Sequence, residues 1–77
     1  MEPKPIGSYV RKEEQIGVIC QTTKEVGYVY VKWLTNWCES HQIVQYYMER
    51  VSTDTLQEIS LVEITPGLSA LRRKVLR

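Results

Sequence analysis

The strongest pattern of hydrophobic and polar positions lies in residues 28–34, which are almost all β-branched or aromatic. Side chains alternate between the two faces of a β-strand. One face of this segment is wholly apolar and consists of Val29, Val31 and Trp33. The other face combines aromatic rings with polar tips and consists of Tyr28, Tyr30 and Lys32. The pattern predicts a central antiparallel strand with one dry face and one partly solvated face.

Weaker patterns on both sides of this segment predict further strands. Residues 8–11 and 15–22 form two strand candidates, and the second has apolar residues on both faces, which indicates that it is covered from two sides. Residues 35–40 have the composition of a loop, and residues 52–56, with Ser, Thr and Asp, predict one 3₁₀ turn. Residues 57–64 then predict a closing strand, which the Pro-Gly pair that follows brings to an end.

Two segments admit two structures each. The apolar spacing in residues 42–51 fits an amphipathic helix, whereas their Ile, Val and Tyr content fits a strand over about 42–48. Leu68, Leu71 and Val75 follow one another at i, i+3 and i+7, which fits a short amphipathic helix or an extended arm. About ten residues do not hold a helix in water alone, so this segment must dock on a partner or on its own chain.

Composition places the chain among small soluble proteins. Its 77 residues favour one domain, and an apolar fraction of 43% is too high for a disordered chain. No apolar run approaches the roughly 18 residues of a membrane span. The segment 1–5 lacks the apolar stretch of a secretory signal, which predicts a protein of the cytoplasm or of a particle assembled there.

Charge is unevenly distributed. Residues 1–67 hold six Lys or Arg against nine Asp or Glu, a net charge of −3, while residues 68–77 hold four basic residues and no acidic one, a net charge of +4. A basic tail on a mildly acidic body indicates an acidic partner surface for the tail.

Four short motifs carry a resemblance to a known family. They are Gly17-Val18-Ile19, Tyr30-Val31-Lys32-Trp33-Leu34, Tyr46-Tyr47-Met48-Glu49 and Leu56-Gln57-Glu58-Ile59-Ser60. Over about residues 8–62 the chain resembles the small SH3-like proteins of tailed bacteriophages, which share five short strands and a 3₁₀ turn before the last one. Virion members of that group are scaffold or connector pieces, and no shared catalytic residue is carried over.

The expected fold is therefore all-β, a small five-stranded SH3-like barrel. An extended N-terminal arm (1–7) precedes the barrel (8–64), and a basic amphipathic arm or short helix (65–77) follows it. The resemblance implies a non-enzymatic cement, decoration or connector subunit of a phage-like particle. Its location would then be the virion. The alternative is a cytoplasmic small barrel that binds single-stranded nucleic acid or a host protein.

Candidate chemistry in the sequence is sparse. Cys38 and His41 have the spacing of zinc ligands, and Cys20 could add a third, but a structural site needs four ligands, usually in two close pairs. The same Cys38–His41 pair could be a nucleophile with its base, yet nothing marks an oxyanion hole. We therefore expect no metal, no cofactor and no catalysis.

Partner binding is the remaining function. A tryptophan in a loop is a typical interface anchor, and the apolar and basic residues of the tail fit a larger protein subunit, of a capsid or tail, or a second copy of the chain. The predicted contact residues are Tyr28, Tyr30, Trp37, Leu68, Leu71, Arg72, Arg73, Val75 and Leu76.

Two alternatives use the same aromatic residues. Tyr28, Tyr30 and Lys32 could stack the bases of a single-stranded nucleic acid, although a net acidic body lacks the expected basic footprint. An aromatic cage for a cation or a proline-rich peptide could instead form from Trp33, Trp37, Tyr30 and Tyr47.

Overall fold

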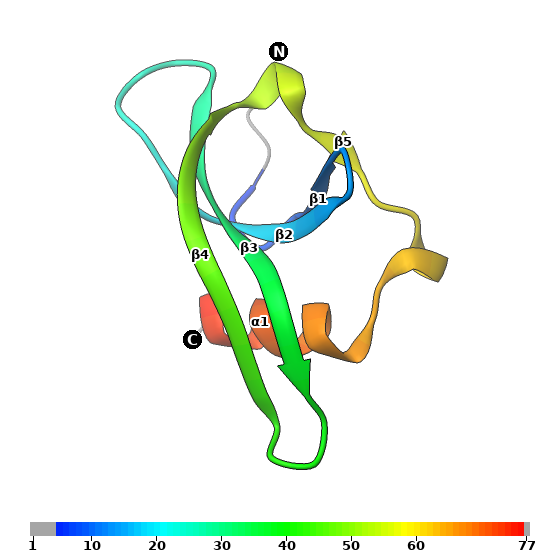
Figure 1. The fold of residues 1–77 in the computed structure, drawn as a ribbon. Coiled ribbons are helices and arrows are strands. Elements are labelled where there is room, and N and C mark those ends of the chain that lie inside the picture. Colours follow the sequence, from blue (N-terminus) through cyan, green and yellow to red (C-terminus); the bar gives the residue numbers. More distant parts are fainter. Residues whose placement is uncertain (1–4, 77) are drawn as a thin grey trace.

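The chain folds into one antiparallel five-stranded sheet with a short helix on its outer side, as seen in a computed structural model that describes residues 5–76 (Figure 1). The strands are β1 (Tyr9–Lys12), β2 (Gln15–Thr22), β3 (Tyr28–Cys38), β4 (Ile43–Ser52) and β5 (Gln57–Glu58). Two 3₁₀ turns, η1 (Thr53–Thr55) and η2 (Leu61–Glu63), precede the helix α1 (Pro66–Val75). The strand order is β4-β3-β2-β1-β5.

Most of the predicted strands are present. β2 has the expected bounds, β1 begins one residue later than expected, and the 3₁₀ turn η1 precedes the last strand. The ambiguous segment 42–51 is the strand β4, because it pairs with β3 from Ile43 to Ser52. Pairing with β3 therefore decides between the helix and the strand, both of which the local spacing allowed.

Two predicted boundaries are wrong. Residues 35–38 are not a loop, because β3 keeps its pairing with β4 as far as Cys38. The closing strand is limited to Gln57 and Glu58, which pair with Arg11 and Val10 of the short strand β1. Beyond them the chain leaves the sheet and forms η2.

The sheet is open rather than closed into a barrel. β4 and β5 lie at its two edges, and within residues 5–76 they do not pair with each other. The two-residue length of β5 accounts for this, since it provides pairing positions for β1 alone. Figure 1 shows the long β3–β4 ribbon crossing the shorter β1 and β2.

The inner face of the sheet is the main core. The expected dry face of β3 is confirmed, since Val29, Val31 and Trp33 are buried. They pack in one cluster with residues from four other segments: Val10, Ile19, Val51 and Leu56. Gly17 lies under Trp33, and a Cβ atom there would stand 2.3 Å from the backbone oxygen of Lys32. Only glycine fits this close approach of β2 to β3.

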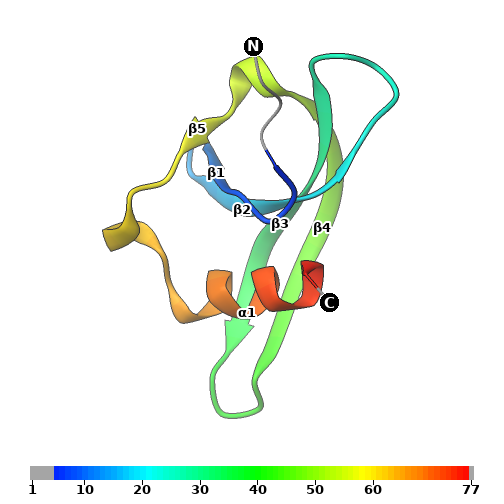
Figure 2. The same ribbon diagram turned by 180° about the vertical axis from the view of Figure 1, so that it is seen from behind.

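A second cluster joins α1 to the outer face (Figure 2). Leu68 and Leu71 are fully buried there against Val18 and Val44. The expectation that β2 is covered from both sides is thus met, because Val18 lies outside and Ile19 inside. Burying each leucine stabilises the fold by about 1.5–3 kcal/mol. The tail is therefore a helix that docks on its own chain.

Local signals explain where the helix begins and ends. The Thr65 side chain accepts a hydrogen bond from the Leu68 backbone N–H at 3.3 Å, and Pro66 occupies the first turn. Three basic residues, Arg72, Arg73 and Lys74, fill the last turn, where the helix dipole favours positive charge.

The N-terminal segment is held in place from Gly7 onward. The Gly7 N–H donates to the Ile19 oxygen at 2.8 Å, and the Ile19 N–H donates to the Ser8 oxygen at 3.0 Å. Arg72 Nε donates to the Gly7 oxygen at 2.9 Å, which ties this segment to α1. The predicted arm therefore makes backbone bonds near its end, while residues 1–4 lie outside the described part.

Candidate interaction surface

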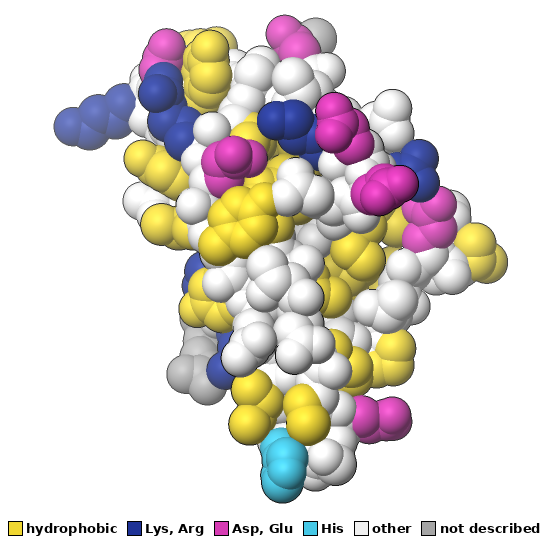
Figure 3. Space-filling model, in the orientation of Figure 1, with side chains coloured by type: hydrophobic (Ala, Val, Ile, Leu, Met, Phe, Trp, Pro, Cys, Tyr) yellow, Lys and Arg dark blue, Asp and Glu magenta, His cyan; other side chains and the backbone are white. Residues whose placement is uncertain are grey.

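The face turned away from α1 carries charges of both signs. Figure 3 shows Lys and Arg side chains beside Asp and Glu side chains over its upper half. The lower part, over the β3–β4 hairpin, is mostly uncharged. A surface of mixed sign does not provide the continuous positive track that a phosphate backbone requires. The candidate surface lies on the outer face, which Figure 2 shows from the front.

The outer strip is the upper part of the β3–β4 ribbon that α1 leaves uncovered. In an antiparallel pair, directly opposed residues point to the same face. The register pairs Tyr30 with Arg50, Lys32 with Met48 and Leu34 with Tyr46. The strip thus consists of Tyr28, Tyr30, Lys32, Tyr46, Met48 and Arg50.

Two cation–aromatic contacts fix the rings of Tyr28 and Tyr46, two of the three tyrosines of the strip. Lys32 Nζ lies 4.7 Å from the centre of the Tyr46 ring, and Arg50 Cζ lies 4.5 Å from the centre of the Tyr28 ring. Each contact links diagonal neighbours across the two strands and contributes about 0.5–1 kcal/mol at an exposed site. The rings are therefore held in place before any partner binds, which lowers the entropy cost of binding.

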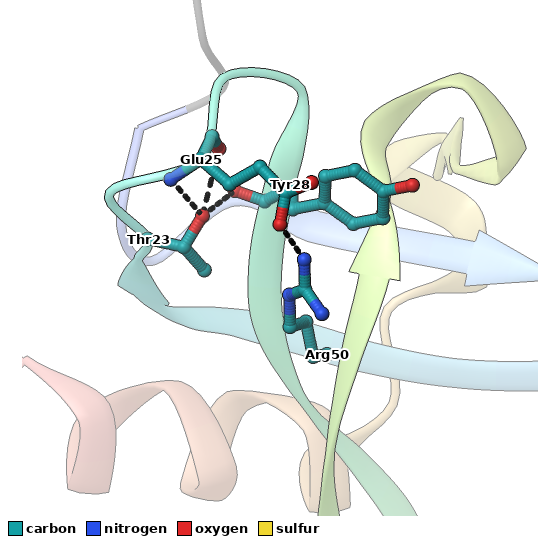
Figure 4. A network of polar contacts seen from close by, with 4 residues as sticks. All are labelled: Thr23, Glu25, Tyr28 and Arg50. Carbon is teal, nitrogen blue, oxygen red and sulfur yellow. Dashed lines mark hydrogen bonds and ion pairs between the residues drawn. The ribbon is translucent and has the colours of Figure 1, made fainter.

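The β2–β3 loop supports one end of the strip. Figure 4 shows Glu25 reaching from this loop to the Arg50 guanidinium, with which it forms an ion pair. The Thr23 hydroxyl accepts from the Glu25 N–H at 3.2 Å and lies 2.8 Å from the Glu25 backbone oxygen and 3.0 Å from that of Tyr28. Gly27 turns the loop with a φ of 88°, a conformation that favours glycine. The loop thus fixes the position of the Arg50 guanidinium through Glu25.

Strand β4 is exposed on both faces as well as along its edge. Met48 and Tyr46 are 54% and 41% exposed on the outer face, and Tyr47 is 41% exposed on the inner face. Next to Tyr47 on the inner face, Glu49 accepts a hydrogen bond from Nε1 of the buried Trp33 at 3.1 Å. Tyr47 contacts Gln15 through its hydroxyl. These bonds anchor β4 to the core while its large side chains stay in solvent.

A separate apolar knob lies in η2. Leu61 is 86% exposed and Val62 is 93% exposed, and Figure 1 shows this turn standing away from the sheet. Arg11 holds the turn through an ion pair with Glu63 at 3.1 Å, and it also donates to Gln57 at 3.2 Å. Two adjacent apolar side chains on a tethered turn are suited to a hydrophobic pocket on another protein.

Trp37 occupies an unexpected place. A β-bulge at Thr35 shifts the pairing, so that Leu34 faces Tyr46 but Asn36 faces Gln45. Alternation alone would put Trp37 on the inner face, opposite to Leu34; the extra residue moves it to the outer face. There Trp37 is half-buried beside Gly67, where a Cβ atom would lie 2.9 Å from Trp37 Cβ. Trp37 therefore packs against α1, and it is not the exposed loop residue that was predicted to contact a partner.

The predicted tail contacts are likewise redistributed. Leu68 and Leu71 are fully buried within the chain, so they are not available to a partner, and Val75 packs against the same cluster. Arg72 lies with its Cζ 5.6 Å from the Tyr9 ring centre. Of the predicted tail contacts described here, the exposed ones are Arg72, Arg73 and Leu76. Arg73 also lines a shallow depression with Gln42, Ala70 and Lys74.

The residues proposed for other chemistry do not converge. Trp33 and Tyr47 face inward whereas Tyr30 and Trp37 face outward, so the four do not enclose one cage. Cys38 lies 3.4 Å from the Ser40 hydroxyl, which lowers the pKa of its thiol. Burial raises the pKa of Cys20, whose Sγ lies 3.4 Å from the Tyr30 backbone oxygen.

Metal ligation finds no support in this geometry. Among residues 5–76, no group of three or more His, Cys, Asp or Glu side chains could hold a metal ion. The same part of the chain contains no helix that is long and apolar enough to cross a membrane.

Four strip residues were missing from the predicted protein contacts. Lys32 was predicted to contact only a nucleic acid, and Tyr46, Met48 and Arg50 were not predicted to contact any partner. Their alternation in the sequence is visible, but it becomes a signal only when the segment is known to be a strand and its register with Tyr28 and Lys32 is known.

Comparison with known proteins leaves the function to be argued from this surface. No protein-family model, no curated protein and no solved structure matches the chain.

Proposed function

We propose that this chain is a non-enzymatic protein-interaction module that binds a larger protein subunit through the outer strip. The observation that carries the proposal is the strip itself: three tyrosines and a methionine, exposed to different degrees, lie on one side of the sheet, and two of the rings are preset by Lys32 and Arg50. Aromatic residues, methionine and arginine are the types enriched in protein interfaces. The exposed Leu61–Val62 knob offers a second contact.

The architecture supports a structural role. The five strands and the 3₁₀ turn before the last one agree with the SH3-like arrangement that the motifs predicted, although the sheet stays open. We propose that the fold is an open SH3-like variant and that the chain is a cement, decoration or connector subunit of a phage-like particle. Because Leu68 and Leu71 are buried against the outer face of the sheet, the contacts with the larger subunit come from the strip and the knob rather than from the tail.

Site-specific photo-crosslinking tests this proposal. A photoreactive amino acid replaces Met48 in the strip, and a control variant carries it at Val26, a position in the β2–β3 loop that is even more accessible, 97% exposed against 54% for Met48. Both variants are produced in the native host and the particle fraction is analysed. We expect the Met48 variant, and not the Val26 variant, to crosslink to one larger subunit, in a product distinguished by its mass from a dimer of this chain, and Tyr28→Ala with Met48→Ala to reduce incorporation. Equal labelling from both positions, or full incorporation of the double variant, would contradict the proposal.

Single-stranded nucleic acid is the second candidate, because three tyrosines share a face with Lys32 and Arg50. Bases stack on such rings and phosphates bind such cations. Fluorescence anisotropy with a labelled oligothymidylate at low and high salt separates the two functions. A salt-sensitive complex that Tyr30→Ala weakens would favour nucleic acid, whereas the protein-interaction proposal expects no complex.

A further inference from the structure

The free edge of β4 is the longest unpaired backbone surface among the described strands. β4 has ten residues and pairs with β3 on one side only, so every second residue directs its N–H and C=O groups away from the sheet. Natural sheets protect an edge of this kind with proline, a bulge, charged side chains or a covering segment. The two charged side chains of β4 are both engaged within the chain, Glu49 with Trp33 and Arg50 with Glu25. β4 contains no proline, the bulge of the ribbon lies in β3, and no described element pairs beyond β4.

We propose that two copies of the chain pair antiparallel along β4, about a two-fold axis at Met48, and form one continuous ten-stranded sheet. The occupant of the edge is thus a second copy. This inference goes beyond the proposed function, because it concerns self-association and needs no other partner.

The pleat restricts the possible registers. An axis perpendicular to the sheet keeps each face on its own side, and opposed residues in an antiparallel pair share a face. The axis must therefore pass at a residue and not between two residues. Centring it on Glu49 would place two carboxylates opposite each other, and centring it on Arg50 would oppose two guanidinium groups, both of which are unfavourable.

An axis at Met48 gives complementary pairs on both faces. On the outer face, Arg50 of one copy lies opposite Tyr46 of the other, so that the tyrosine ring meets the aliphatic part of an arginine whose guanidinium keeps its ion pair with Glu25. On the inner face, Glu49 lies opposite Tyr47, whose hydroxyl can donate to a carboxylate. An axis at Tyr47 would instead put Arg50 opposite the apolar Val44. Nine residues of each strand, 44–52, pair in the Met48 register.

The dimer has a functional consequence. Because the two-fold axis is perpendicular to the sheet, the outer strips of both copies lie on the same side. One dimer therefore presents two strips, which is the geometry that a connector between two larger subunits requires.

Disulfide trapping tests the register. In a background with Cys20→Ala and Cys38→Ser, the Met48→Cys variant is oxidised and examined on a non-reducing gel. We expect a crosslinked dimer, because opposed Cβ atoms in a sheet lie about 4.5–5.5 Å apart. Tyr46→Cys and Arg50→Cys should each stay monomeric alone and crosslink when mixed. A dimer trapped more readily through Tyr47→Cys than through Met48→Cys would overturn the proposed axis.

Sedimentation equilibrium tests the association without any crosslink. The wild-type chain should show a concentration-dependent dimer, and Met48→Lys should remain a monomer because two ammonium groups would meet at the axis. Val26→Lys is the matched control and should dimerise normally. Circular dichroism confirms that both variants fold, which we expect because both side chains are exposed. A wild-type chain that stays monomeric up to millimolar concentration would overturn the inference, whatever the strip binds.

Discussion

The contact between α1 and the sheet gives the sharpest stability prediction. Leu71 is fully buried between the helix and the outer face, beside Val18 and Val44. Leu71→Ala removes buried methyl groups and leaves a cavity, which costs about 3 kcal/mol by comparison with other buried leucines. A chain of 77 residues has about 4–12 kcal/mol in total, so the loss is a large share of its stability.

Differential scanning calorimetry and urea unfolding measure this effect. In a domain of this size, 1 kcal/mol corresponds to roughly 4–8 °C, so Tm should fall by about 10–25 °C. Leu61→Ala is the matched control, because the same side chain is lost from a position that is 86% exposed, and its Tm should change by less than about 3 °C. If Leu71→Ala behaved like Leu61→Ala, the helix would not be docked on its own sheet in solution.

Three further predictions follow from local contacts. Thr65→Ala removes the side-chain cap of α1 and should lower the free energy of unfolding by about 1 kcal/mol, measured from the urea midpoint. Gly17→Ala would bring a Cβ within 2.3 Å of a β3 backbone oxygen, and should cost about 1–3 kcal/mol or prevent folding, which thermal unfolding monitored by circular dichroism will show. The Ser40 hydroxyl lowers the pKa of Cys38, whereas burial raises the pKa of Cys20. Cys38 should therefore react faster than Cys20 with a disulfide reagent between pH 6 and pH 8, its rate should rise with pH over this range, and Ser40→Ala should slow it. Equal rates for the two thiols across this range would contradict that order.

The sequence by itself determined the elements that depend on local pattern. The alternation from Tyr28 to Trp33 gave the central strand and its buried face, because a strand repeats every two residues. The Ser-Thr-Asp segment predicted the 3₁₀ turn η1, in which the Asp54 N–H donates to the Ser52 hydroxyl at 3.4 Å. The spacing of Leu68, Leu71 and Val75 allowed a helix with one apolar side, and α1 is that helix.

Only the tertiary structure decided how these elements meet. Residues 42–51 form a strand because they pair with β3 along most of their length. The local spacing of apolar residues holds no information about a pairing partner that is distant in the sequence. One bulge at Thr35 turned Trp37 toward α1 and so removed it from the exposed surface. The outer strip exists because two strands hold Tyr28, Lys32 and Tyr46 side by side, a proximity set by register between residues far apart in the chain. Burial of the tail was decided in the same way, since an amphipathic helix needs an apolar surface and the outer face of β2 and β4 supplied it.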